Sequence, residues 1–153
     1  MYAAVRVRGV SDVNKKARKS LKHIGLDKKN NGVLLPERDE FRGMLKACKD
    51  FVTFGEIDSE LAADLIELEA SKKGRKAEES LESYDSVDEF VEAVDSGEAS
   101  FSNLEGLNNV LSLHPPKKGY KDTRTHYNQG GSLGDRGEDI DKLIERMAKV
   151  GKN

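Results

Sequence analysis

The sequence has little material for a large hydrophobic core or for covalent cross-links. Tryptophan is absent, aromatic residues make up 6% of the chain, and its 153 residues include three prolines and one cysteine. Because Cys48 stands alone, it cannot form an internal disulfide, and nothing in the cysteine usage indicates secretion. Hydrophobic and charged residues are nearly balanced, at 36% and 35%. This balance indicates a lean core beneath a heavily charged surface.

Long apolar runs are missing as well. No apolar stretch approaches the ~20 residues that span a bilayer. The first ten residues carry Arg6 and Arg8 inside their apolar stretch, which argues against a signal peptide. We therefore expect a soluble, intracellular protein that forms one ordinary domain, or one small domain with a large appendage.

The charges are divided unevenly along the chain, although the net charge is only −2. Residues 1–53 hold 13 Lys or Arg and 6 Asp or Glu, a formal charge of +7, and residues 54–113 hold 4 and 16, a charge of −12. Residues 114–153 hold 9 and 6, which gives +3. Two basic ends therefore enclose an acidic middle. Such asymmetry is typical of a protein with a polyanionic partner.

The first third of the chain alternates between strand and helix patterns. Residues 2–8 alternate in the manner of a half-buried strand, and residues 32–35 and 50–54 read as two further strands. The first helix has apolar residues at Val13, Ala17, Leu21 and Ile24, with Ser11 or Asp12 as its cap and Gly25 at its end. A second helix over residues 38–49 has the inner stripe Phe41, Met44, Leu45 and Cys48. This βαβαβ order predicts helices on one face of a small sheet, with the other face free for a partner.

The rest of the chain is predicted to be mostly helical. Ser59 is expected to cap one helix, and Ser86 with Glu89 forms a capping box for another that ends at Gly97. Residues 71–83 form a charged connector between the two. A short strand over residues 110–113 ends at two prolines, residues 117–137 form a long polar loop, and an amphipathic helix starts near Glu138.

Catalysis is not supported by any group of residues. Cys48 falls on the apolar stripe of the second helix, so a small core residue explains it better than a nucleophile. The carboxylates of the acidic middle fall at solvent positions of helices, and no pair stands out for acid/base chemistry.

Metal and nucleotide sites are equally unsupported. His23, His114 and His126 are scattered and lack ligand partners at metal-binding spacing, so no metal or other cofactor is expected. The glycines at 130, 131, 134 and 137 do not match a nucleotide fingerprint. The acidic residues at the start of the final helix would also repel a phosphate.

Binding to irregular RNA is the interpretation on which several features converge. The segment 115–121 places three lysines around Tyr120, and Arg124, His126, Tyr127 and Gln129 follow. Cations suit phosphates, aromatic rings suit unstacked bases, and glycines let the backbone approach RNA closely. The lysines of the first helix add a second basic surface, although on that helix alone they are explained equally well as a solvated face.

Several segments resemble one ribosomal family. The stretch around Arg42-Gly43-Met44, with Pro36 before it and residues 49–54 after it, resembles the large-subunit ribosomal protein family called L-thirty in bacteria. Residues 113–119 and 125–131, followed by the helix over 139–147, resemble the longer archaeal and eukaryotic branch, called L-seven in eukaryotes. The chain length and the lack of a long basic N-terminal extension favour the archaeal form.

This resemblance implies a ferredoxin-like core. Together with the element and charge patterns above, it predicts an α+β fold with that core over residues 1–57, an acidic helical insertion over 58–109, and a strand, basic loop and helix over 110–153. It also implies a non-enzymatic structural role in the large subunit, in the cytoplasm, without membrane attachment or homo-oligomers. The expected partners are large-subunit rRNA, near 5S rRNA, and neighbouring ribosomal proteins. The acidic insertion is expected to face solvent or protein, because its charge opposes phosphate.

The residues predicted to bind RNA come from both basic ends of the chain. They are Arg6, Arg8, Lys15, Lys16, Arg18, Lys19, Lys22, Lys28, Lys29, Asn30, Arg42, Lys46, His114, Pro115, Pro116, Lys117, Lys118, Gly119, Tyr120, Lys121, Arg124, His126, Tyr127, Gln129, Gly130, Gly131 and Arg136.

Two alternatives remain. Arg8 after the first strand and Asn31 before the second resemble the Arg and Asn of acylphosphatases, small enzymes with a similar fold that act on acyl phosphates. A free-standing RNA-binding module or assembly factor would also fit the charge pattern.

Overall fold

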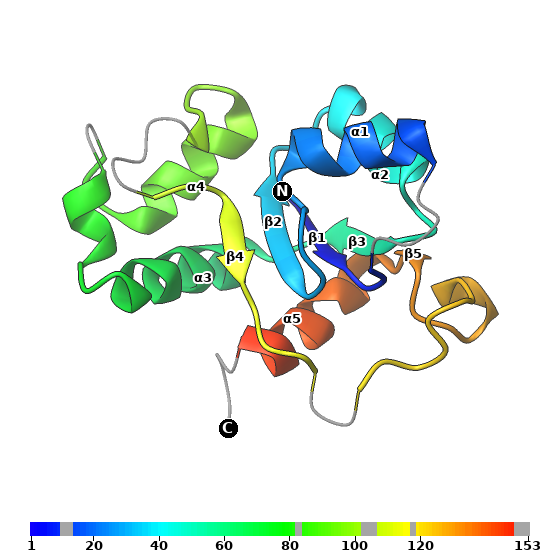
Figure 1. Ribbon diagram of the computed structural model, residues 1–153. Coiled ribbons are helices and arrows are strands. Elements are labelled where there is room, and N and C mark those ends of the chain that lie inside the picture. The colour runs from blue at the N-terminus through cyan, green and yellow to red at the C-terminus, as the bar shows by residue number, and fades with distance from the viewer. Residues whose placement is uncertain (10–13, 82–83, 102–106, 117–118, 149–153) are drawn as a thin grey trace.

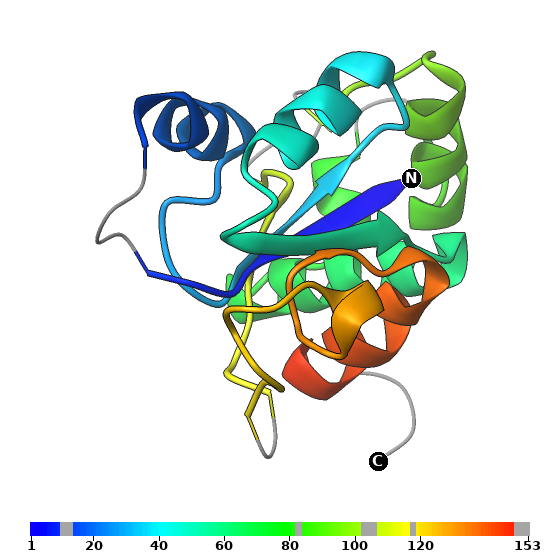
Figure 2. The same cartoon turned by 90° about the vertical axis from the view of Figure 1, so that its right-hand side faces the viewer.

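The computed structural model describes residues 1–9, 14–81, 84–101, 107–116 and 119–148. These residues form a mixed sheet with helices on both faces (Figures 1 and 2). The described strands are β1 (Tyr2–Arg6), β2 (Asn31–Leu35), β3 (Val52–Glu56), β4 (Val110–Ser112) and β5 (Gly134–Asp135). The described helices are α1 (Lys15–Ile24), α2 (Asp39–Ala47), α3 (Ser59–Lys72), α4 (Val87–Ser96) and α5 (Ile140–Ala148). Short 3-10 turns lie at Ala77–Ser80, Tyr127–Gln129 and Gly137–Asp139.

The sheet has the strand order β4-β2-β1-β3-β5. The central strand β1 runs antiparallel to both β2 and β3, and β4 runs antiparallel to β2. Only the pairing of β3 with β5 is parallel. The predicted βαβαβ core is therefore confirmed, together with the short strand near residue 110 and the C-terminal helix. The two-residue strand β5 was not predicted.

One face of the sheet packs against α1 and α2. Side chains of the strands, including Ala4, Val33 and Phe54, meet Leu21 of α1 and Leu45 of α2 in one buried cluster. The amphipathic patterns of the two helices thus place their apolar stripes as the sequence predicts.

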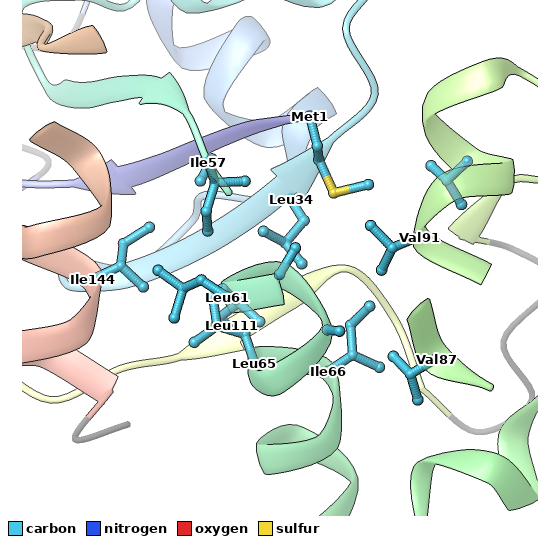
Figure 3. Packing of buried hydrophobic residues seen from close by; sticks show 14 of the residues in the cluster. Met1, Leu34, Ile57, Leu61, Leu65, Ile66, Val87, Val91, Leu111 and Ile144 are labelled. Atoms are coloured by element: carbon cyan, nitrogen blue, oxygen red, sulfur yellow. The ribbon is translucent and has the colours of Figure 1, made fainter. Parts of the chain in front are cut away.

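The opposite face of the sheet is covered too, so the predicted free face is wrong. A second buried cluster joins Leu34 of β2 and Leu111 of β4 to α3, α4 and α5 (Figure 3). In that view Leu61 and Leu65 of α3 lie beside Leu111, and Ile144 projects from α5. Strand β1 is therefore buried on both of its faces, including the face that carries Ala4. All three predicted segments of the chain, 1–57, 58–109 and 110–153, contribute to this second cluster.

The helix ends agree with the predictions at some positions and correct them at others. Gly25 and Gly97 end α1 and α4 in the left-handed conformation, and Ser86 caps α4 by accepting from Glu89 N. The cap of α1, however, is Asn14, which accepts from Ala17 N at 2.8 Å. The predicted caps Ser11 and Asp12 lie outside the described residues, as does Val13. Ser59 is the first residue of α3 rather than its cap.

The outer edge of β4 is covered by two side chains of α3. The amide of Ser112 donates to Glu69 Oε1 at 3.0 Å, and Lys72 Nζ donates to the Ser112 carbonyl and pairs with Glu69. This ion pair satisfies backbone groups that an edge strand otherwise offers to another chain.

Candidate nucleic-acid interface

Helix α1 presents a continuous cationic surface. Its cations Lys15, Lys16, Arg18, Lys19 and Lys22 are all exposed, and the helix contains no acidic residue. Within the described residues, no carboxylate lies within 4.0 Å of any of them. A helix that is merely solvated usually mixes signs along its face. The positive potential of α1 is therefore not balanced by nearby carboxylates, and it suits a polyanion. On α2, Arg42 and Lys46 are exposed beside it.

The segment after α1 is held in place from inside the protein by Arg6. This side chain is only 3% exposed, and its guanidinium donates to the carbonyls of Leu26 and Asp27 at 2.8 and 3.0 Å. Burial lowers the pKa of Arg6. Although Arg6 was among the predicted RNA contacts, the structure places it away from solvent, as a support for this segment. Lys28 and Lys29, by contrast, are exposed.

Two side-chain contacts bring the C-terminal loop to the same end of the sheet. The hydroxyl of Tyr120 donates to Asn30 Oδ1 at 2.6 Å, and His126 Nε2 lies 3.0 Å from Asp50 Oδ1. Asn30 directly follows the two exposed lysines and adopts a φ of 71°. The loop that carries the second basic surface is therefore anchored beside the first.

Arg136 holds the loop against β3. Its Nε donates to Thr53 Oγ1 at 2.7 Å, and Nη2 donates to the Ser132 carbonyl at 2.9 Å. The guanidinium carbon lies 4.6 Å from the centre of the Tyr127 ring, and the Tyr127 hydroxyl donates to Asp139. Desolvation lowers the pKa of Arg136. These groups form contacts within the protein itself, although the side chains of Tyr127 and Arg136 remain partly exposed.

The glycines of the loop also include a residue that serves the packing of the loop and a residue that is exposed. A Cβ at Gly131 would lie 2.0 Å from the Thr125 carbonyl oxygen, so this residue is glycine because the loop packs closely on itself. The structure therefore places Gly131, like Pro116, in the interior. Gly130 is exposed, with a φ of 88°.

The remaining predicted contacts that the structure describes are exposed or half-buried. Arg8 is half-buried, with its guanidinium 5.6 Å from the Phe51 ring centre. Lys117 and Lys118 lie outside the described residues. The exposed predicted residues of the loop are His114, Pro115, Gly119, Lys121, Arg124, Gln129 and Gly130.

Sequence reasoning missed two cations of α5. Lys142 and Arg146 are exposed and line an open hollow with Tyr120, Tyr127 and Arg136. Their spacing of four residues already places them on one face of the helix. The sequence does not show that this face turns toward the loop.

The acidic segment forms a surface of opposite character. A hollow of about 420 Å³ between α3 and α4 is lined by Ser59 and the carboxylates of Glu60, Asp64, Asp88 and Glu92. Nearby on α3, partial burial and the charges of Asp64, Glu78 and Asp88 raise the pKa of Glu67. The carboxylates here already repel one another, and phosphates would add to that repulsion.

Other chemistry finds no support among the described residues. No group of three or more His, Cys, Asp or Glu side chains is arranged to hold a metal ion in the part of the chain that the structure describes. Cys48 is buried, and burial raises its pKa to about 12, which keeps the thiol protonated. Among the helices of the described ranges, none is long and apolar enough to cross a membrane.

Exposed cations on α1 and on the C-terminal loop of a small α+β protein are typical of the general class of proteins that bind a polyanion. The profile of the family described as Ribosomal protein L30p/L7e matches residues 2–52, from β1 to the start of β3. Relatives extend the match to nearly the whole chain. The protein named "Large ribosomal subunit protein uL30" from Methanocorpusculum labreanum is 40% identical over 152 residues, which cover 96% of this chain and 99% of the relative.

Proteins of the same name from Archaeoglobus fulgidus and Methanobrevibacter smithii are 39% and 38% identical, with the same coverage. The chain therefore belongs to the ribosomal protein L30p/L7e family. The resemblance to its archaeal long form is confirmed. Membership of this family identifies a structural, non-enzymatic protein, which excludes the acylphosphatase-like alternative.

Proposed function

We propose that this chain is a structural constituent of the large ribosomal subunit in the cytoplasm and that it binds large-subunit rRNA through two joined surfaces. The first surface consists of α1, Lys28, Lys29, Arg42 and Lys46. The second is the exposed part of the loop over residues 113–137. Each surface offers cations to phosphates, and the loop adds aromatic rings and exposed backbone.

The observation that carries this proposal is the pair of contacts that unite the two surfaces. Tyr120 bonds to Asn30, and His126 lies against Asp50, so the loop sits beside the basic segment that follows α1. RNA bound at this end of the sheet would meet cations from both ends of the chain. The acidic residues of α3 and α4 lie elsewhere and face solvent or protein.

In this proposal the three segments of the chain have different tasks. Residues 1–57 and 110–153 bind rRNA, whereas residues 58–109 complete the core and turn their charge away from the RNA. Neighbouring ribosomal proteins and nearby 5S rRNA complete the surroundings, and the free protein is a monomer that needs no membrane.

Sedimentation of an extract from the source cells tests the proposal. We expect the chain to migrate with the large subunit and to remain there in high salt, because its contacts are numerous and partly buried. A peak of free protein at the top of the gradient would instead indicate an assembly factor. Chemical probing of the washed particle then tests whether 5S rRNA lies nearby.

A further inference from the structure

We propose that the hollow between the C-terminal loop and α5 binds an unpaired nucleotide of rRNA, and that Arg146 and Lys142 hold its phosphate. This inference rests on the proposed function and deepens it, because it assigns a ligand to a site outside the predicted set of contacts. The hollow has a volume of about 370 Å³. Its walls are formed by residues of the segment 119–139 and by the face of α5 that carries the two cations.

The charge of this hollow is strongly one-sided. Four cations line it, Lys121, Arg136, Lys142 and Arg146, against the single carboxylate of Asp139. Asp139 is already engaged, because it accepts from the Tyr127 hydroxyl and lies 3.8 Å from Lys142 Nζ. Arg146 has no carboxylate within 4.0 Å among the described residues. An anion would therefore meet a positive charge that the protein leaves unbalanced.

Planar groups make the hollow suitable for a base as well as a phosphate. The rings of Tyr120 and Tyr127 form part of its lining, and the guanidinium of Arg136 lies over the Tyr127 ring at 4.6 Å. Unstacked bases in RNA are bound on aromatic rings and on guanidinium planes. A base within a duplex remains in its stack, so this arrangement favours an unpaired nucleotide.

The hollow is continuous with the proposed RNA-binding surface. Tyr120 lines it and also donates to Asn30, which follows the exposed Lys28 and Lys29. An RNA strand along that segment can therefore place one nucleotide in the hollow without leaving the surface. A free nucleotide is a poorer fit, because Glu138 and Asp139 just before α5 and Asp141 in its first turn stand where a phosphate cradle would need uncharged backbone.

Binding of labelled RNA to the purified full chain tests the inference. The probes are a single-stranded RNA of about 12 nucleotides and a duplex of the same length. The variant is Arg146→Gln, with Lys76→Gln as a matched loss of one exposed cation outside the hollow and Lys19→Gln as a probe of α1. We expect Arg146→Gln to weaken single-strand binding about fivefold and to lower the salt slope for the single strand by about 0.7, with little change for the duplex. Lys76→Gln should leave both affinities unchanged.

Each other outcome has a defined meaning. If Arg146→Gln behaves like Lys76→Gln while Lys19→Gln weakens both RNAs, the nucleotide site is wrong and the proposed function stands. If neither Arg146→Gln nor Lys19→Gln affects binding, the proposed function fails as well. An equal loss for duplex and single strand, or displacement of the single strand by AMP, would overturn the assignment to an unpaired RNA nucleotide.

Intrinsic tyrosine fluorescence gives a second readout. The chain has no tryptophan and four tyrosines, two of which line the hollow. In a Tyr2→Phe/Tyr84→Phe background the signal reports Tyr120 and Tyr127 alone. We expect the single strand to quench it through stacking, and Arg146→Gln to weaken that quenching. An unchanged signal at saturating RNA would contradict a base in the hollow.

Discussion

The hydroxyl of Tyr120 donates a 2.6 Å hydrogen bond to Asn30 Oδ1, across a separation of 90 positions in the sequence. Burial raises the pKa of Tyr120, so the phenol stays protonated and remains a donor throughout the physiological range. This bond fixes the C-terminal loop on the segment that carries Lys28 and Lys29. The loop therefore lies against the segment that follows α1 before any RNA is bound.

Loss of this hydroxyl should cost stability and affinity together. We predict that Tyr120→Phe lowers the free energy of unfolding by about 1 kcal/mol, because Asn30 loses its donor. Affinity for rRNA should fall as well, since the loop is held less firmly. Urea unfolding and filter binding measure the two effects. Tyr2→Phe is the control, because the Tyr2 hydroxyl has no hydrogen bond among the described residues, and it should change neither quantity.

Gly131 is predicted to tolerate no side chain. A Cβ there would lie 2.0 Å from the Thr125 carbonyl oxygen. We expect Gly131→Ala to destabilise the protein by about 3 kcal/mol, at the upper end for overpacking. At the exposed Gly43 of α2, a Cβ would meet no atom within 4 Å, so Gly43→Ala should stabilise the helix by about 0.5 kcal/mol. If thermal unfolding showed that both variants change the stability in the same direction, the close packing of the loop at Gly131 would be refuted.

The Glu69–Lys72 pair should protect the edge of the sheet. We predict that Glu69→Ala lowers the free energy of unfolding by about 1 kcal/mol, because the Ser112 amide loses its acceptor. The uncovered edge of β4 should also promote self-association. Glu67→Ala, an exposed change on the same helix, serves as the control. Sedimentation velocity that showed equal monomer content in both variants would contradict the protective role.

Asp122 should make the loop sensitive to acid. Its carboxylate accepts from Thr125 Oγ1 at 2.6 Å and from Arg124 N at 2.9 Å, and these bonds lower its pKa, with the Thr125 hydroxyl as the main cause. The folded pKa lies below the unfolded value of about 3.9. The stabilisation is therefore complete above that value and is lost as the pH falls through the folded pKa. The protection of the Arg124 amide from hydrogen exchange, relative to the intrinsic rate at each pH, should fall over this acidic range, and Asp122→Asn should remove this change in protection.

The sequence predicts the regular elements well because their signals are local. The apolar spacing of Leu21 and Ile24, and the stop at Gly25, depend only on neighbours within a few turns. Strand β5 could not be predicted, because two residues around Gly134 carry no pattern and become a strand only by pairing with Thr53. The packing of helices on the second face of the sheet could not be predicted either. The apolar sides of α3 and α5 do not specify which surface they meet.

The candidate site was predictable in composition but not in orientation. Charge and residue type identify α1 as a basic segment and the loop as a basic, glycine-rich one. They did not separate cations that face solvent, such as Lys19, from those that support the backbone, such as Arg6. The alternation of β1 did place Arg6 on one face, but only the tertiary structure shows that this face is covered. For the same reason, the sequence did not identify Lys142 and Arg146 as residues of the candidate site.

The most direct test of the central claim is a structure of the large subunit that contains this chain. The measurement is the number of phosphate contacts, with N···O distances below about 4 Å, made by each segment. We predict that residues 113–137 make more of these contacts than residues 58–98, and that α1 contributes the rest of the basic surface. More phosphate contacts from residues 58–98 than from residues 113–137 would contradict the division of the chain into RNA-binding ends and an acidic middle.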